Sequence, residues 1–139
     1  MAILAIDQGT SSTKAILLDS DFKVIAKAAS ALPVDHNQSG MSQASGQDMW
    51  HSLTDAIGKL QIPAGVKIEA AALANQGESI LAWDRITGEP LTPIIIWQDS
   101  RSAKLCQERK SHNQFVLSKT GLTIDTYFVA PKMLWIKNQ

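Results

Sequence analysis

The segment 3–18 constrains the fold of this chain most, because two apolar runs enclose a short polar stretch. The apolar residues 3–6 lead into Asp7, and a second apolar run covers residues 15–18. Between the runs lie a glycine, several hydroxyl side chains and a lysine, namely Gly9, Thr10, Ser11, Ser12, Thr13 and Lys14. Apolar runs joined by so few residues predict a β-hairpin. Its tip is too short to have a core of its own, so its polar residues call for a chemical explanation.

The predicted tip has the composition of a site for phosphate and a metal ion. Gly9 lets a ligand approach the backbone closely. The hydroxyls of residues 10–13 donate hydrogen bonds, and successive main-chain N–H groups in a turn form a concavity that binds anions. Lys14 adds a positive charge on a flexible stem. An ionised Asp7 would repel phosphate unless a cation lay between them, and Mg²⁺ is the usual ion.

The same residues exclude one other interpretation of the tip and leave a second one open. A P-loop is excluded, because its glycine and lysine spacing is absent and no helix follows Gly9. An ordinary Asp/Gly turn with solvated hydroxyls stays open when this segment is considered alone.

Composition excludes several classes of protein. The chain has 139 residues, which suits one domain, and its 13 basic and 13 acidic residues give a formal net charge of zero. Nothing in this balance points to nucleic acid, and no apolar run is long enough to span a membrane. The N-terminus has no signal-peptide pattern, and the single cysteine, Cys106, fits a reducing compartment. We therefore expect a cytoplasmic protein.

Periodicity predicts an α/β domain with a mixed sheet and flanking helices. The expected strands cover residues 3–7, 13–19, 22–31, 66–74, 80–83 and 94–97. The expected helices cover residues 46–60, 100–110 and 112–119, followed by a last helix with Pro131 in its first turn. Ser45 and Ser100 are the expected N-caps of the first two helices, and residues 33–45 are expected to form a loop.

Polar and aromatic residues gather at the ends of the later elements. They are Glu78, Trp97, Gln98, Asp99 and Tyr127. In open α/β sheets, ligands bind beyond the carboxyl ends of strands. Carboxylates and amides bind hydroxyl groups, and an aromatic ring provides a wall for a carbon skeleton, so this set suits an uncharged polyhydroxylated substrate. Individually, Glu78 and Asp99 also fit helix caps or solvated residues, and Trp97 also fits a core position.

The chain resembles the FGGY-type carbohydrate kinases, and most closely their glycerol kinase branch. The first block is typical of the first phosphate loop of the actin-like ATPase fold, which is ribonuclease H-like. Five blocks occur in the order seen in that family: Asp7-Gln8-Gly9-Thr10-Ser11-Ser12, Asn75-Gln76-x-Glu78, Trp83-Asp84-x-x-Thr87-Gly88-x-Pro90, Trp97-Gln98-Asp99-x-Arg101 and Thr120-Gly121-Leu122-x-Ile124-Asp125-x-Tyr127-Phe128.

The resemblance implies an ATP-dependent kinase that phosphorylates a hydroxyl of a sugar or polyol. Asp7 would act on Mg²⁺, and the residues implied for the phosphates of ATP are Gly9, Thr10, Ser11, Ser12 and Lys14. The residues implied for the acceptor substrate are Gln76, Gly77, Glu78, Trp97, Gln98, Asp99 and Tyr127. Lys14 stands where glycerol kinases have an arginine, so a compact ammonium charge replaces a planar guanidinium group.

Gly77 departs from the pattern, because glycerol kinases place at this position an arginine that binds glycerol hydroxyls. Glycine in place of arginine removes the guanidinium hydrogen-bond donors and leaves more space beside the substrate. We therefore expect a larger polyol or a sugar as substrate, rather than glycerol.

The resemblance also implies parts that residues 1–139 do not contain. The family's catalytic aspartate lies in a Gly-Asp-Gln-like segment, which is absent here, as is the second domain that closes over the nucleotide. We therefore expect this chain to be the N-terminal portion of the first kinase domain. It would hold no catalytic residue and would be inactive alone. The alternative is a stand-alone, non-catalytic module that binds a sugar or phosphate or docks to a partner. An unpaired sheet edge and exposed apolar surface would favour association, for example as a homo-oligomer.

Overall fold

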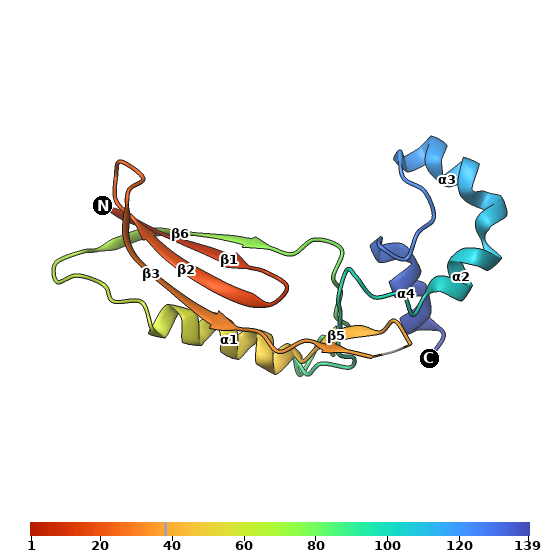
Figure 1. Cartoon of the computed structure of the whole chain (residues 1–139), viewed down its shortest axis with the longest axis horizontal. Coiled ribbons are helices and arrows are strands. Elements are labelled where there is room, and N and C mark those ends of the chain that lie inside the picture. The colour runs from red at the N-terminus through yellow and green to blue at the C-terminus, as the bar shows by residue number, and fades with distance from the viewer. Residues whose placement is uncertain (38) are drawn as a thin grey trace. The chain divides into compact units, whose positions relative to one another are not determined.

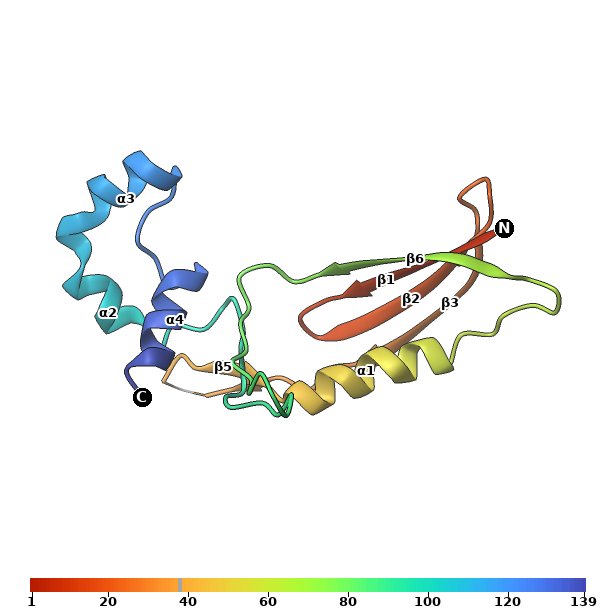
Figure 2. The ribbon, with the colours of Figure 1, turned by 180° about the vertical axis from the view of Figure 1, so that it is seen from behind.

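The computed structural model describes residues 1–37 and 39–139, which form two compact units. Unit 1 comprises Met1–Val34 and Ser45–Gln76, and unit 2 comprises Asp35–Ala44 and Gly77–Gln139. Figures 1 and 2 show the elements of both units. Within the part of the chain that is described, no helix is long and apolar enough to cross a membrane.

Unit 1 is a four-stranded mixed sheet with one helix. Its elements are β1 (Ala2–Gln8), β2 (Ser12–Leu18), β3 (Val24–Ala31), α1 (Gly46–Gly58) and β6 (Ile68–Asn75). The strand order is β3-β2-β1-β6, in which β2 is antiparallel to β1 and β3, whereas β6 is parallel to β1. The structure therefore confirms the predicted hairpin, the first helix and the mixed sheet.

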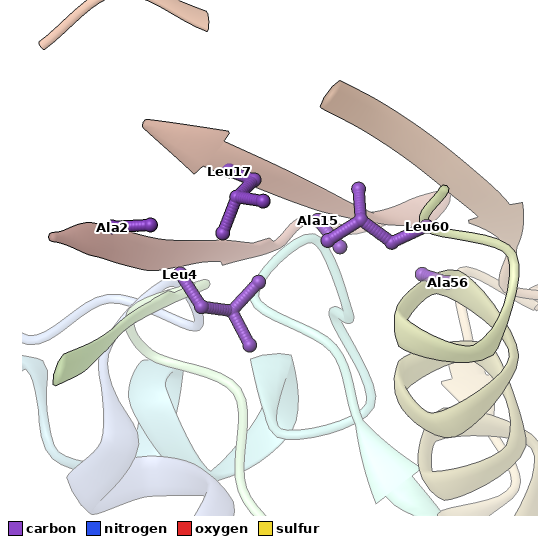
Figure 3. Packing of buried hydrophobic residues seen from close by; sticks show 6 residues of the cluster. All are labelled: Ala2, Leu4, Ala15, Leu17, Ala56 and Leu60. Carbon is purple, nitrogen blue, oxygen red and sulfur yellow. The ribbon is translucent and has the colours of Figure 1, made fainter. Parts of the chain in front are cut away.

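The core of unit 1 lies between the sheet and α1. In β2, Thr13, Ala15 and Leu17 are buried and alternate with more exposed residues, as expected for a strand with one covered face. Figure 3 shows the buried apolar cluster, which consists of Ala2, Leu4, Ala15, Leu17, Ala56 and Leu60. The hydroxyls of Thr13 and Ser52, 2.7 Å apart, join β2 to α1 within this buried layer.

Unit 2 combines a small antiparallel sheet with short helices. The strands β4 (Asp35–His36), β5 (Ser42–Ala44) and β7 (Ile94–Ile95) lie in that order. The helices are α2 (Ala103–Glu108), a 3₁₀ turn (Lys110–His112), α3 (Asn113–Thr120) and α4 (Val129–Lys137). The helices predicted at 112–119 and after Tyr127 are confirmed, and the helix predicted at 100–110 is shorter than expected.

One loop prediction and two strand predictions differ from the structure in unit 2, although the strand predicted at 94–97 is present in part. Residues 33–45 are not only a loop, because they include β4 and β5; Gln38, which belongs to the same prediction, lies outside the described residues. The strand predicted at 80–83 is reduced to isolated bridges. The apolar run 94–97 contributes only β7, which pairs with β5 instead of entering the main sheet. Strands of two or three residues leave no periodic pattern to detect.

The predicted helix caps have different outcomes. Ser45 caps α1 as predicted, since its hydroxyl accepts hydrogen bonds from the backbone N–H groups of Gln47 and Asp48. Ser100 does not cap α2: Ser102 stands at that position, and the Ser100 hydroxyl donates to the carbonyl of Gly40 at 3.0 Å. The Ser100 side chain therefore bonds to a backbone group far away in the sequence instead of capping the helix that follows it.

Substituting Leu17 tests the core of unit 1. Leu17 is 0% exposed, so Leu17→Ala should lower the free energy of unfolding by roughly 2–5 kcal/mol through lost burial and a residual cavity. Leu73→Ala is the matched control, because Leu73 is a strand residue of the same sheet that is 64% exposed; its effect should stay within about 0.5 kcal/mol. Urea unfolding followed by circular dichroism measures both. Equal losses in the two variants would contradict this account of the core.

Candidate functional site

The tip of the β1–β2 hairpin is held by hydrogen bonds to its backbone. The N–H of Gly9 donates to the carbonyl of Ser12 at 2.9 Å, and the carbonyl of Gly9 accepts from the side-chain amides of Gln8 at 2.8 Å and Gln76 at 3.3 Å. The carbonyl of Ser11 accepts from the N–H of Leu32 at 2.9 Å. Several tip carbonyls are therefore committed to protein donors, which fixes the shape of the turn.

The backbone at the tip is close-packed around Gly9. A Cβ atom at this position would lie 3.2 Å from the carbonyl oxygen of Ser12, which is tighter than ordinary contact. The hydroxyl residues Thr10 and Ser12 are half-buried, and Ser11 is exposed. The tip thus presents hydroxyl groups beside a glycine at which a side chain would crowd the Ser12 carbonyl.

Asp7 and Lys14 face each other across the two strands. They are register partners, and the Nζ atom of Lys14 lies 3.3 Å from a carboxylate oxygen of Asp7. Their side chains are 53% and 56% exposed, so this ion pair contributes little to stability and exchanges readily for other partners. Because side chains alternate along a strand, both lie on the sheet face opposite to Thr13 and α1.

Asp7 is the one carboxylate among residues 7–14 that could bind a metal ion. Among residues 1–37 and 39–139, no group of three or more His, Cys, Asp and Glu side chains is arranged to hold a metal ion. Asp7 fits a Mg²⁺ ion that keeps most of its waters and is shared with phosphate, which is the usual way that ion is bound.

In unit 2, the side chain of Glu78 contacts the first residue of α4. Glu78 has a left-handed backbone with φ of 60°, and its carboxylate accepts a hydrogen bond from the N–H of Val129 at 2.7 Å. A carboxylate at a helix N-terminus is favoured by the helix dipole. A non-glycine residue at positive φ stores strain, which is common at functional sites.

Trp97 and Tyr127 form an edge-to-face aromatic pair. Their ring centroids are 5.7 Å apart, and Tyr127 makes a second edge contact with Phe128 at 5.2 Å. The N–H of Trp97 donates to the hydroxyl of Ser79 at 3.0 Å, which ties the strand end to the segment containing Glu78. Trp97 is half-buried and Tyr127 is 45% exposed, so the pair leaves ring surface open to a ligand.

Asp99 is fully buried and bonded to the protein. Its oxygens accept from the N–H of Ser42 at 2.6 Å and from the N–H of Arg101 at 2.8 Å. The Arg101 guanidinium adds bonds of 2.9 and 2.8 Å, donates to Gln43 and lies 5.0 Å from the centroid of the Trp135 ring. Asp99 is thus built into the framework, whereas its neighbour Gln98 is exposed.

The sequence-based search missed Lys132, which is 0% exposed on α4. Its ammonium donates to the carbonyls of Thr126, Tyr127 and Phe128. Burial lowers the pKa of Lys132, and the carboxylate of Glu78 opposes that shift. A signal was present, because a lysine inside the apolar run 129–136 is unusual on a helix that packs against protein.

The predicted residues therefore fall into two groups, one in each unit. The tip residues and Gln76 come together in unit 1, where Gln76 bonds to the tip itself. The second group is in unit 2, where Glu78 accepts a hydrogen bond from α4, Trp97 and Tyr127 are in ring contact, and Asp99 pairs with Arg101. Gly77 belongs to unit 2 as well, and a Cβ atom there would meet nothing within 4 Å.

Comparison with known sequences gives a match over nearly the whole chain. A sequence model of the N-terminal domain of the FGGY family of carbohydrate kinases matches residues 2–139. Apulose kinase of Pectobacterium atrosepticum is 40% identical over 134 residues, which are 94% of this chain and 27% of that protein. Glycerol kinase of Methylobacterium nodulans is 39% identical over 99% of this chain and 28% of its own length. The chain thus spans little more than a quarter of these relatives.

Solved structures agree with this match. The structure of Plasmodium falciparum glycerol kinase with ADP has a TM-score of 0.90 at 29% identity, covering 99% of this chain and 29% of that one. Ligand-bound xylulose kinase from Lactobacillus acidophilus has a TM-score of 0.87 at 25% identity, covering 99% of this chain and 28% of that one. These likenesses confirm the expected α/β, actin-like architecture with a mixed sheet.

Substituting Asp99 tests the buried ion pair. Asp99→Asn leaves the Arg101 guanidinium buried without its counter-charge, so the free energy of unfolding should fall by roughly 3–5 kcal/mol. Glu108→Gln is the control, since Glu108 and Arg109 form an exposed pair at 3.4 Å; its effect should stay below about 1 kcal/mol. Chemical denaturation monitored by tryptophan fluorescence distinguishes the two. A mild effect of Asp99→Asn would show that the pair is not essential to unit 2.

Proposed function

The chain belongs to the FGGY family of carbohydrate kinases, and we propose that it is the N-terminal portion of the first domain of an ATP-dependent kinase that phosphorylates a sugar or polyol. The geometry of the hairpin tip carries this proposal. A turn with hydroxyl side chains, close backbone approach at Gly9 and a half-exposed carboxylate is suited to phosphate and Mg²⁺.

Each tip residue has a separate role in the proposal. The hydroxyls of Thr10, Ser11 and Ser12, with the backbone beside Gly9, donate to phosphate oxygens of ATP. The Lys14 ammonium leaves its weak pairing with Asp7 and neutralises phosphate charge. Asp7 would hold Mg²⁺, which when bound would neutralise charge developing on the phosphates.

The aromatic and acidic group of unit 2 is proposed to bind the acceptor substrate. The open surface of Trp97 and Tyr127 provides an apolar wall for a sugar carbon skeleton. The Glu78 carboxylate has one oxygen bonded to α4 and retains acceptor capacity for a substrate hydroxyl. Gln98, which is exposed, supplements these contacts, whereas Asp99 positions the segment from within, because its oxygens already accept from protein donors.

Transfer of the phosphoryl group also needs a residue that accepts or orients the acceptor proton. We assign no catalytic residue within 1–139, since no Gly-Asp-Gln-like segment occurs there. We propose that this segment, together with a nucleotide-closing domain, completes the kinase, and that these 139 residues alone do not turn over.

A stand-alone binding module is the competing proposal, and β6 argues against it. This strand is parallel to β1 at the edge of the sheet, yet nearly all its residues are exposed. Parallel strands are usually covered on both faces. The exposure of β6 therefore favours a setting in which more protein covers it.

The tip predicts nucleotide binding that depends on Gly9. Gly9→Ala pushes a methyl group against the Ser12 carbonyl, so affinity for MgADP should fall by roughly tenfold or more, as expected for a displaced phosphate turn. Gly58→Ala is the matched control, because a Cβ atom there meets nothing within 4 Å. Isothermal titration calorimetry measures both. Unchanged affinity in Gly9→Ala would remove the tip from the nucleotide site.

Gly77 predicts a substrate larger than glycerol. Gly77→Arg places a guanidinium in open space, and its donors should raise affinity for glycerol relative to D-xylulose by about tenfold, the equivalent of one charge-assisted hydrogen bond. Gly58→Arg on α1, also in open space, should leave the ratio unchanged. The change in tryptophan fluorescence on titration with each compound provides the measurement. Selective glycerol binding by the unsubstituted chain would refute the proposal of a larger substrate.

A further inference from the structure

We infer that Lys132 is a positioning residue that fixes the backbone of residues 126–128 and thereby directs the Tyr127 ring toward the acceptor substrate. The inference rests on the proposed function, in which Tyr127 contacts the acceptor. Lys132 would not touch the substrate and would act only through the loop that carries the ring.

The contacts of the Lys132 ammonium are unusually complete. Its Nζ atom lies 2.7 Å from the carbonyl oxygen of Thr126, 2.5 Å from that of Tyr127 and 3.4 Å from that of Phe128. An ammonium group has three N–H donors and no acceptor, so three successive carbonyls match its capacity. A single side chain thus gathers the carbonyls of the whole segment around one point.

Two carboxylates hold the N–H groups of the same segment. Asp125 accepts from the N–H of Tyr127 at 2.8 Å, and Glu78 accepts from the N–H of Val129 at 2.7 Å. The positive group therefore binds the carbonyls and the negative groups bind the N–H groups. This arrangement restricts the backbone on both sides of Tyr127.

Burial of the charge indicates a role beyond packing. Lys132 is 0% exposed, and an apolar side chain of similar length would fill the same space without the cost of desolvating an ammonium group. The residues on either side of it in α4, 129–131 and 133–136, are all apolar. The charged residue is explained by the carbonyls that it gathers.

The ring of Tyr127 needs such support. It is 45% exposed, and it meets the rings of Trp97 and Phe128 edge to face. A half-exposed ring changes rotamer readily, whereas a fixed backbone limits the directions that it can adopt. A ring held in one direction loses less freedom when it meets a substrate.

The single tyrosine of the chain makes the test specific. Replacement of tyrosine by 3-fluorotyrosine gives one ¹⁹F signal, which reports on Tyr127 alone. Lys132→Met removes the ammonium and keeps the length of the side chain. Lys137→Met is the matched control, because Lys137 is an exposed lysine of the same helix. We expect Lys132→Met to move the signal toward that of free fluorotyrosine, and Lys137→Met to leave it in place.

A second label separates loop positioning from loss of folding. Labelling with 5-fluorotryptophan gives a ¹⁹F signal for each of the four tryptophans, and a Trp135→Phe variant identifies the signal of Trp135 on α4. A shifted Tyr127 signal with an unchanged Trp135 signal supports positioning, and unchanged signals for both residues overturn it. If Lys132→Met unfolds, Lys132→Arg replaces it, since the planar guanidinium retains the charge but cannot gather three carbonyls at one point. An unshifted Tyr127 signal in folded Lys132→Arg also overturns the inference.

Titration with D-xylulose and with glycerol separates this inference from the proposed function. We expect the Tyr127 signal of the unsubstituted chain to respond to one of these polyols, with an affinity reduced about tenfold in the Lys132 variant and unchanged in Lys137→Met. No response to either polyol in the unsubstituted chain would count against the proposed acceptor site, whereas the ligand-free spectra would still decide whether Lys132 positions the ring. Equal polyol affinity in the unsubstituted and Lys132 variant chains would overturn the positioning role.

Discussion

The fully buried carboxylate of Asp99 is the interaction on which the arrangement of unit 2 depends. Its oxygens accept from the N–H of Ser42 in β5 and from the backbone and guanidinium of Arg101, so a strand and the segment before α2 meet at one charge. A buried carboxylate is tolerated only when its acceptor sites are filled, and here they are. Arg101 extends the link to α4 through Trp135.

Charged side chains also fix the backbone around α4. Glu78 accepts from the N–H of Val129 at the start of the helix, and Lys132 donates to the carbonyls just before it, including that of Tyr127. Unit 1 uses neutral groups for a similar end, since the amides of Gln8 and Gln76 hold the Gly9 carbonyl. In both units, residues proposed to meet a ligand stand on backbone that other side chains have fixed, and such support is what precise binding requires.

The sequence predicted best where a long periodic pattern existed. The hairpin, the helix capped by Ser45 and the mixed sheet follow from alternation, helical spacing and local capping chemistry. It failed where structure is short or held by distant partners. The two-residue strands β4 and β7 have no period, and Ser100 bonds to Gly40 sixty positions away instead of capping α2. Lys132 was missed because the sequence shows a lysine inside an apolar run but does not show the backbone carbonyls that accept its hydrogen bonds.

By itself, the sequence determined the family, the hairpin and the residue types available for phosphate and polyol, because these depend on local order and on motif spacing. Only the tertiary structure decided which of those residues are buried and bonded within the protein and which stay accessible. It gave Asp99 to the framework, left Trp97 and Tyr127 partly open, and placed Lys132 against the loop that carries Tyr127. The physical reason is that burial and hydrogen-bond saturation arise between segments distant in sequence, and these properties separate a structural charge from one that is free to bind a ligand.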